Sequence, residues 1–277
     1  MLSSQVLNLS ALVFKIPYKF ALMNAVDQGD VQYSIENGIA TVEFHHPLSN
    51  SLPGKVLAKL ANTITELGTN DDALVIIVRS EGERAFCAGA SFDELVAIDD
   101  LEVGKVFFSG FANVINACRK CPKLIIGRVQ GKAVGGGVGL AASFDYTLAT
   151  KHAAVKLSEL AVGIGPFVVG PAVERKIGLS AMSQLAIDAT EWQTAEWARA
   201  KGLYADIFDT AAEMDAAIST LANKLKNSNP EAMRLLKQVF WRGTDDWDTL
   251  LAERAAMSGQ LVLSDFTKNA INSFKKK

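Results

Sequence analysis

The chain has 277 residues, of which 49% are hydrophobic and 21% are charged. This composition is typical of one large globular domain. The formal net charge of −2 gives no support for a nucleic-acid partner, and no stretch is apolar and long enough to span a bilayer. Three cysteines are too few for a disulfide framework, so we expect a soluble protein of the cytoplasm. Cys118-x-x-Cys121 lacks the second pair that a zinc site needs, and no metal is expected.

Residues 1–22 do not fit the pattern of the rest of the chain. They are apolar, contain Lys15 and Lys19 and are interrupted by Pro17. No small-residue cleavage site follows a clean apolar core, and the arginines of a transit peptide are absent. We interpret this stretch as an extension that is not native, with a native start at Met23; a transit peptide is the alternative.

Strand and helix patterns alternate through the first half of the chain. Residues 31–36 and 39–44 are two β-like runs that meet at Asn37-Gly38, a strong hairpin signal. A polar, turn-rich loop covers 47–53, and apolar residues recur with helical spacing over 55–67. A strand is predicted over 74–79, and helices are predicted from Asp93 onward and over 102–119.

The second half begins with a strand over 124–129, a helix over 137–144 and short strands over 146–149 and 154–157. From Ser180 onward the pattern is almost wholly helical. Asn229-Pro230 predicts a helix start, with Asn as the cap and Pro at the first helical position. Ser264 is expected to cap the last helix.

Two loops of small residues each follow a predicted strand. One is Phe86-Cys-Ala-Gly-Ala90, and the other is Gly135-Gly136-Gly137. Gly and Ala let backbone N–H groups approach a ligand closely, and two N–H groups aimed at one oxygen form an oxyanion hole. Together with the segments 144–149, 157–160 and 162–167, their order and spacing resemble the crotonase superfamily. Its enoyl-CoA hydratases and isomerases hold a thioester carbonyl in this way.

The resemblance runs from about Val31 to the C-terminus, and it implies both a fold and a substrate. The expected fold class is α/β, a crotonase-like spiral of ββα units over 23–214 with a helical C-terminal trimerisation region over 215–277. A homotrimer or homohexamer is therefore expected. The implied substrate is an acyl-CoA thioester, so coenzyme A is part of the substrate and no separate cofactor is needed.

The resemblance also implies roles for particular residues. The oxyanion donors fall on the backbone N–H groups of Ala90 and Gly136, and the catalytic base falls on Glu159. Further substrate contacts are expected at five positions: Leu52, Ala88, Gly89, Gly137 and Phe167.

The family takes catalytic carboxylates from two positions, and only one of them is filled here. Glu159 matches the later position, whereas the position three residues beyond Gly136 is Gly139. Two carboxylates can orient a water for hydration, but one base is enough to move a double bond. The segment from Glu159 to Phe167 also resembles single-glutamate Δ3,Δ2-enoyl-CoA isomerases. We therefore favour isomerisation over hydration, and we expect glutamate at position 139 to shift the balance towards hydration.

Several alternatives stay open. Hydration, thioester hydrolysis and decarboxylation all fit the same scaffold. A non-catalytic homologue that binds CoA or RNA is the alternative from another class, and the acidic balance and the retained Glu159 count against it. A Ser-His-Asp hydrolase needs a histidine, but the three histidines lie outside the matched segments. The triple glycine reads G-G-G-x-G, not the G-x-G-x-x-G of a dinucleotide fold.

Overall fold

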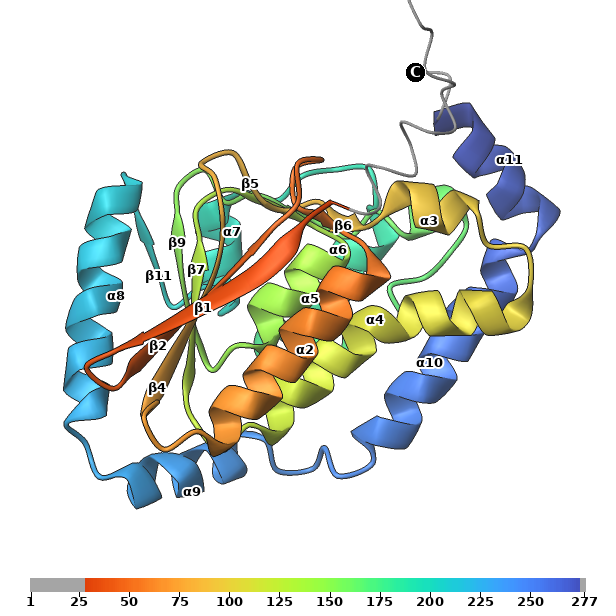
Figure 1. The fold of residues 1–277 in the computed structure, drawn as a ribbon. Coiled ribbons are helices and arrows are strands. Elements are labelled where there is room, and N and C mark those ends of the chain that lie inside the picture. Colours follow the sequence, from red (N-terminus) through yellow and green to blue (C-terminus); the bar gives the residue numbers. More distant parts are fainter. Residues whose placement is uncertain (1–27, 275–277) are drawn as a thin grey trace, which may run out of the picture.

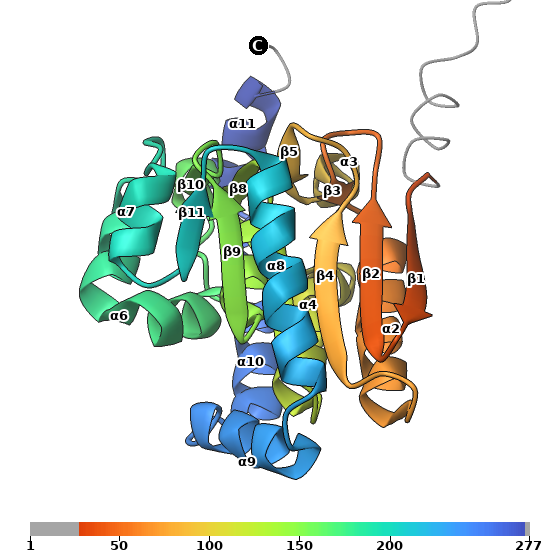
Figure 2. The same cartoon turned by 90° about the vertical axis from the view of Figure 1, so that its left-hand side faces the viewer.

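The computed structural model describes residues 28–274, and the predicted extension over 1–22 lies outside the described residues. Six strands form the main sheet in the order β1-β2-β4-β7-β9-β11. Figure 1 and Figure 2 show helices packed on both faces of this sheet. The first pair is antiparallel, and every later pair is parallel.

The predicted hairpin is confirmed. β1 (Asp30–Glu36) and β2 (Ile39–His45) pair along their whole length. Asn37 and Gly38, with φ of 51° and 82°, make the two-residue turn, whose positive φ values suit the twist of a hairpin.

The rest of the main sheet comes from β4 (Val75–Ser80), β7 (Ile125–Val129), β9 (Tyr146–Thr150) and β11 (Asp206–Phe208). The first three of these confirm the predicted strands to within one residue at either end. β11 was not predicted, because the sequence after Ser180 reads as helical. Its three residues form a strand by pairing with β9 at the sheet edge.

Most helices pack on one face of the sheet and enclose the main core. They are α2 (Gly54–Thr69), α4 (Leu101–Lys120), α5 (Gly136–Ser143), α6 (Gly170–Ile187) and α10 (Trp247–Val262). The opposite face is covered by α8 (Ala211–Lys226), which buries Met214 and Ile218 against the strands. The short helix α7 (Ala195–Ala200) precedes β11.

Short strands form two further sheets beside the carboxyl ends of the main strands (Figure 2). β5 (Ala85–Cys87), β8 (Lys132–Val134) and β10 (Val155–Lys156) form one, and β3 (Ser51–Leu52) and β6 (Gly89–Ala90) form the other. β4, β7 and β9 are thus each followed by a short second strand and then by a helical segment. The predicted crotonase-like repetition of ββα units is therefore confirmed. Open parallel sheets typically bind ligands at the carboxyl ends of their strands, which is where these two short sheets lie.

The C-terminal region is helical, as predicted, but it does not begin at residue 215. α8 starts at Ala211, where Thr210 and Glu213 form a capping box, so the predicted boundary after residue 214 falls inside a helix. Asn229 caps α9 (Pro230–Phe240), and Ser264 accepts a hydrogen bond from Thr267 N–H at 3.3 Å at the start of α11 (Asp265–Phe274). Among residues 28–274, no helix is both long and apolar enough to cross a membrane.

Candidate active site

A cavity of about 710 Å³ lies beside the carboxyl ends of the sheet. Its walls come from the loop after β2, from β6 with α3 (Phe92–Val96), from α4, and from the β8–α5 junction. The loop that contains the single-turn helix η1 (Leu160–Val162) closes another side, and Ser258 of α10 contributes from the C-terminal region. The structure thus brings both predicted glycine loops and the predicted Glu159 to one cavity.

The backbone of the first loop lines this cavity at Ala88, Gly89 and Ala90. Leu52 pairs with Ala90 in the parallel β3–β6 ladder, and Ser91 N–H donates to the Leu52 carbonyl at 3.0 Å. Neighbouring N–H groups along a strand point to opposite sides. The Ala90 N–H therefore points away from β3, on the side where Ala90 lines the cavity.

The second loop presents the start of a helix. Gly135 holds φ at 52° and ψ at −114°, a conformation that favours glycine. Val138 N–H donates back to the Gly135 carbonyl at 2.9 Å, so Gly136 N–H precedes the first intrahelical bond of α5. The helix dipole places partial positive charge at this same end.

The two loops lie against each other. A Cβ built on Gly89 would lie 3.2 Å from the Val134 carbonyl oxygen and 3.8 Å from the Gly136 nitrogen. The N–H groups of Ala90 and Gly136 therefore belong to one small region of the cavity wall. Two converging N–H donors can stabilise a developing oxyanion.

Close packing explains why the second loop consists of glycines. A Cβ on Gly136 would lie 2.2 Å from the Phe111 ring, and a Cβ on Gly137 would lie 2.5 Å from the Cys87 carbonyl oxygen. Cys87 itself is buried, and burial raises the pKa of its thiol to about 12. Since the thiolate is the reactive form, Cys87 has a structural role here.

Glu159 is held by the turn that follows it. Its carbonyl accepts hydrogen bonds from Val162 N–H at 3.1 Å and from Ile164 N–H at 3.0 Å. Its side chain points towards the second loop, because a Cβ on Gly135 would lie 2.9 Å from Glu159 Oε1. The carboxylate is thus fixed next to the residue that precedes the Gly136 donor.

The carboxyl group of Glu159 is poorly solvated. Although the residue as a whole is partly exposed, Oε2 is buried and has no hydrogen-bond partner among the described residues. Burial disfavours the charged form and raises the pKa of Glu159 from 4.5 to about 7. A carboxyl group with this pKa can both take and return a proton near neutral pH.

The position of the absent second carboxylate is occupied by an apolar side chain. Gly139 is buried in α5, and a Cβ there would lie 2.5 Å from Val169 Cγ1 and 2.7 Å from Val169 Cβ. Val169 lines the cavity. Glutamate at position 139 alone therefore has no room, and our expectation that this single change favours hydration is corrected by the structure.

The other predicted contacts divide into two groups. Ala88, Gly89 and Phe167 line the cavity, as expected. Leu52 is fully buried in the core, and Gly137 is buried behind the cavity wall. Neither residue lines the cavity.

The prediction missed the phenylalanines that form the distal wall. Phe107, Phe108 and Phe111 of α4 line the cavity, and the rings of Phe107 and Phe108 meet edge to face at 5.0 Å. On an amphipathic helix such residues are indistinguishable from ordinary core residues. Only the position of α4 beside the glycine loops identifies them.

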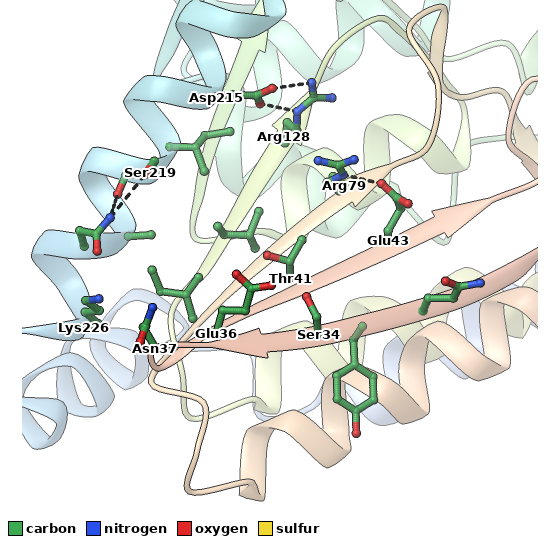
Figure 3. A pocket seen from close by; sticks show the side chains of 17 residues that line it. Ser34, Glu36, Asn37, Thr41, Glu43, Arg79, Arg128, Asp215, Ser219 and Lys226 are labelled. Atoms are coloured by element: carbon green, nitrogen blue, oxygen red, sulfur yellow. Dashed lines mark hydrogen bonds and ion pairs between the residues drawn. The ribbon is translucent and has the colours of Figure 1, made fainter.

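A second hollow, of about 670 Å³, lies on the opposite face of the sheet (Figure 3). It runs between the β1–β2 hairpin and α8. Two ion pairs line it: Arg79 with Glu43 at 2.5 Å, and Arg128 with Asp215 at 2.5 Å. These paired charges hold strands and α8 together, and the groove contains none of the predicted catalytic residues.

Known proteins are similar to this chain in sequence. The sequence model of the family Enoyl-CoA hydratase/isomerase matches residues 34–277. A short-chain-enoyl-CoA hydratase of Clostridium acetobutylicum is 29% identical over 245 residues, which cover 87% of this chain and 93% of that protein. Human mitochondrial methylglutaconyl-CoA hydratase is 31% identical over 233 residues, covering 82% of this chain and 68% of that protein.

Solved structures support the same fold. An enoyl-CoA hydratase from Bacillus halodurans superposes with a TM-score of 0.81 at 18% identity and covers 88% of this chain and 99% of its own. Pseudomonas aeruginosa OdaA superposes with a TM-score of 0.79 at 19% identity over 89% of this chain and 99% of its own. With the fold, the two glycine loops and the sequence match in agreement, the chain belongs to the enoyl-CoA hydratase/isomerase family of the crotonase superfamily.

Proposed function

We propose that the protein moves a double bond in an enoyl-CoA thioester, with Glu159 as the only acid/base group. The thioester is the whole substrate, and coenzyme A serves as its carrier. The single observation that carries this proposal is the packing of Val169 over Gly139, which puts an apolar group where a second carboxylate would be needed.

The oxyanion is stabilised by the backbone. The thioester oxygen accepts hydrogen bonds from the N–H groups of Ala90 and Gly136, next to the positive end of α5. These donors are fixed before the reaction begins, so no reorganisation accompanies the build-up of charge. Loss of one such donor typically lowers the rate by ~10²–10³.

Glu159 carries the proton. In a 3-enoyl-CoA, its carboxylate removes a proton from C2, and the electron pair delocalises into the thioester oxygen to form a dienolate. The protonated Glu159 then returns the proton to C4, and the double bond ends between C2 and C3. One proton leaves and one proton is added, so neither water nor a second base is consumed.

Hydration is the second candidate function. Supporting it, the two relatives named above are hydratases. The cavity contains one more carboxylate, Asp93, but it lies on α3 next to the exposed Phe92. An apolar wall opposite Glu159 offers little to orient an attacking water. This is why isomerisation is the first candidate.

Mass spectrometry separates the two reactions. Purified protein is incubated with 3-hexenoyl-CoA and, separately, with 2-hexenoyl-CoA, and the products are separated by chromatography. Isomerisation gives a product of unchanged mass from the first substrate, whereas hydration adds one water to the second. Rapid hydration of 2-hexenoyl-CoA together with no isomerisation of 3-hexenoyl-CoA would overturn the proposal.

A homotrimer built with the C-terminal helices remains part of the proposal. Supporting it, α9 exposes four large apolar side chains: Leu235, Leu236, Val239 and Phe240. In contrast, α10 packs on its own α4, where a Cβ on Gly104 would lie 2.9 Å from Gly259 Cα. Sedimentation velocity at micromolar concentration tests this, and a monomer alone would contradict it.

A further inference from the structure

The distal part of the cavity is lined by apolar side chains. Beyond the glycine loops, the wall consists of aromatic and aliphatic side chains on α4 and on the loop before α6, among them Phe107, Phe108, Phe111, Ile164 and Val168. Phe111, Ile164 and Val168 are 3–6% exposed, so this wall is nearly closed to bulk water. An acyl group that enters it loses its hydration.

The charges of the cavity are all of one sign. Among the described residues that line it, no lysine, arginine or histidine occurs, and the two ionisable side chains are the carboxyl groups of Asp93 and Glu159. The Oε2 atom of Glu159 also has no donor among these residues. An anionic group beside them would find like charge and no cationic partner.

We propose that the acyl group accepted by this site is electrically neutral and that the cavity rejects acyl groups with a second, terminal carboxylate. This inference rests on the proposed acyl-CoA function and specifies its substrate class. A carboxylate in this wall would be desolvated without a salt bridge, which costs free energy, whereas the burial of a methyl group there is favourable. The aromatic rings instead favour an aliphatic chain or an apolar ring.

A pair of unreactive thioesters tests the inference independently of the reaction. Hexanoyl-CoA and adipoyl-CoA share a six-carbon acyl chain and differ by a terminal methyl group against a terminal carboxylate. Calorimetric titration of the protein with each, and with coenzyme A alone, measures binding without turnover. We expect hexanoyl-CoA to bind on the order of 100-fold more tightly than adipoyl-CoA, from an unpaired-charge penalty of this size.

The possible outcomes are distinct. Equal binding of the two thioesters, or tighter binding of adipoyl-CoA, overturns the neutral-acyl inference while leaving the acyl-CoA site intact. If neither thioester binds more tightly than coenzyme A itself, the acyl-CoA function fails and the inference falls with it.

An added cation gives a second test. Leu95 of α3 lines the cavity and is only partly buried, so its replacement can be tolerated. Leu95→Arg should narrow the preference for hexanoyl-CoA by at least about tenfold through pairing with the adipoyl carboxylate. Leu95→Met, which changes neither charge nor size greatly, should leave the preference unchanged. An unchanged preference in a folded Leu95→Arg protein counts against charge as the basis of selection.

Discussion

Replacement of Glu159 by glutamine should stabilise the protein, and the gain should grow with pH. The pKa of Glu159 is about 7 in the folded chain because of burial, against 4.5 for an ordinary glutamate. Below about pH 4.5 the side chain is protonated in both states, and glutamine resembles it closely. As pH rises towards about 7, the unfolded chain gives up this proton before the folded chain does. The free energy of unfolding of the wild type therefore falls over this interval.

The size of the effect follows from the same shift. Moving a pKa from 4.5 to about 7 corresponds to roughly 3 kcal/mol of lost stability once the group is ionised in both states. The buried Oε2 has no partner among the described residues, so a protonated carboxyl group and a glutamine amide are unpaired there alike and this cost cancels. The partial exposure of Glu159 lowers the expected gain somewhat. We expect Glu159→Gln to be about 2 kcal/mol more stable than wild type near pH 8, and nearly equal to it near pH 4.5.

Chemical denaturation of both proteins across this pH range measures the difference. Glu191→Gln is the matched control, because Glu191 is exposed and its replacement should change the free energy of unfolding little. A difference for Glu159→Gln that stays flat, or that shrinks as pH rises, would refute the claim that burial holds the carboxyl group neutral.

Three further outcomes are expected. Activity on a 3-enoyl-CoA should rise with pH, reach half its maximum near pH 7 and level off above about pH 8, since Glu159 with a pKa of about 7 must be ionised to act as a base; a pH–rate profile of kcat/KM checks this. In a Phe111→Ala background, which relieves the clash at Gly136, Gly136→Pro should be ~10²-fold slower than Gly136→Ala, because only proline lacks the N–H. Lys237→Met should lower the free energy of unfolding by about 3 kcal/mol, since buried Lys237 pairs with Asp145 at 2.9 Å; exposed Lys224→Met is its control.

Local signals account for the parts of the fold that could be predicted. The turn at Asn37-Gly38 needs two positive φ values, and only a few residue types adopt them readily. Asn229 and Ser264 cap helices through their own side chains. The two glycine loops were predicted because close backbone contacts exclude larger residues, and the small residues that this packing needs are visible in the sequence.

Features that depend on distant parts of the chain could not be predicted. β11 is a strand because β9 offers it a free edge, and its own three residues carry no clear strand pattern. In α6, Gly178 has φ 76° and ψ 159°, and this non-helical residue joins two helical segments, of which the one before Ser180 was not predicted. The missing contact at Leu52 has a similar origin, since its side chain turns into the core on the far side of β3.

The packing of Val169 against Gly139 gives a structural test of which reaction the protein favours. Glutamate at this position requires the removal of Val169, whose Cβ would lie 2.7 Å from the new Cβ. We therefore expect Gly139→Glu alone to be unstable and without hydratase activity, whereas Gly139→Glu with Val169→Gly should raise the ratio of hydration to isomerisation. A second carboxylate near Glu159 would raise the pKa of one of the pair and supply an acid beside a base. The assay compares both rates on matched hexenoyl-CoA substrates, with Val169→Gly alone as the control. If the folded double variant shows no higher ratio than this control, the valine in place of a carboxylate does not determine which reaction occurs.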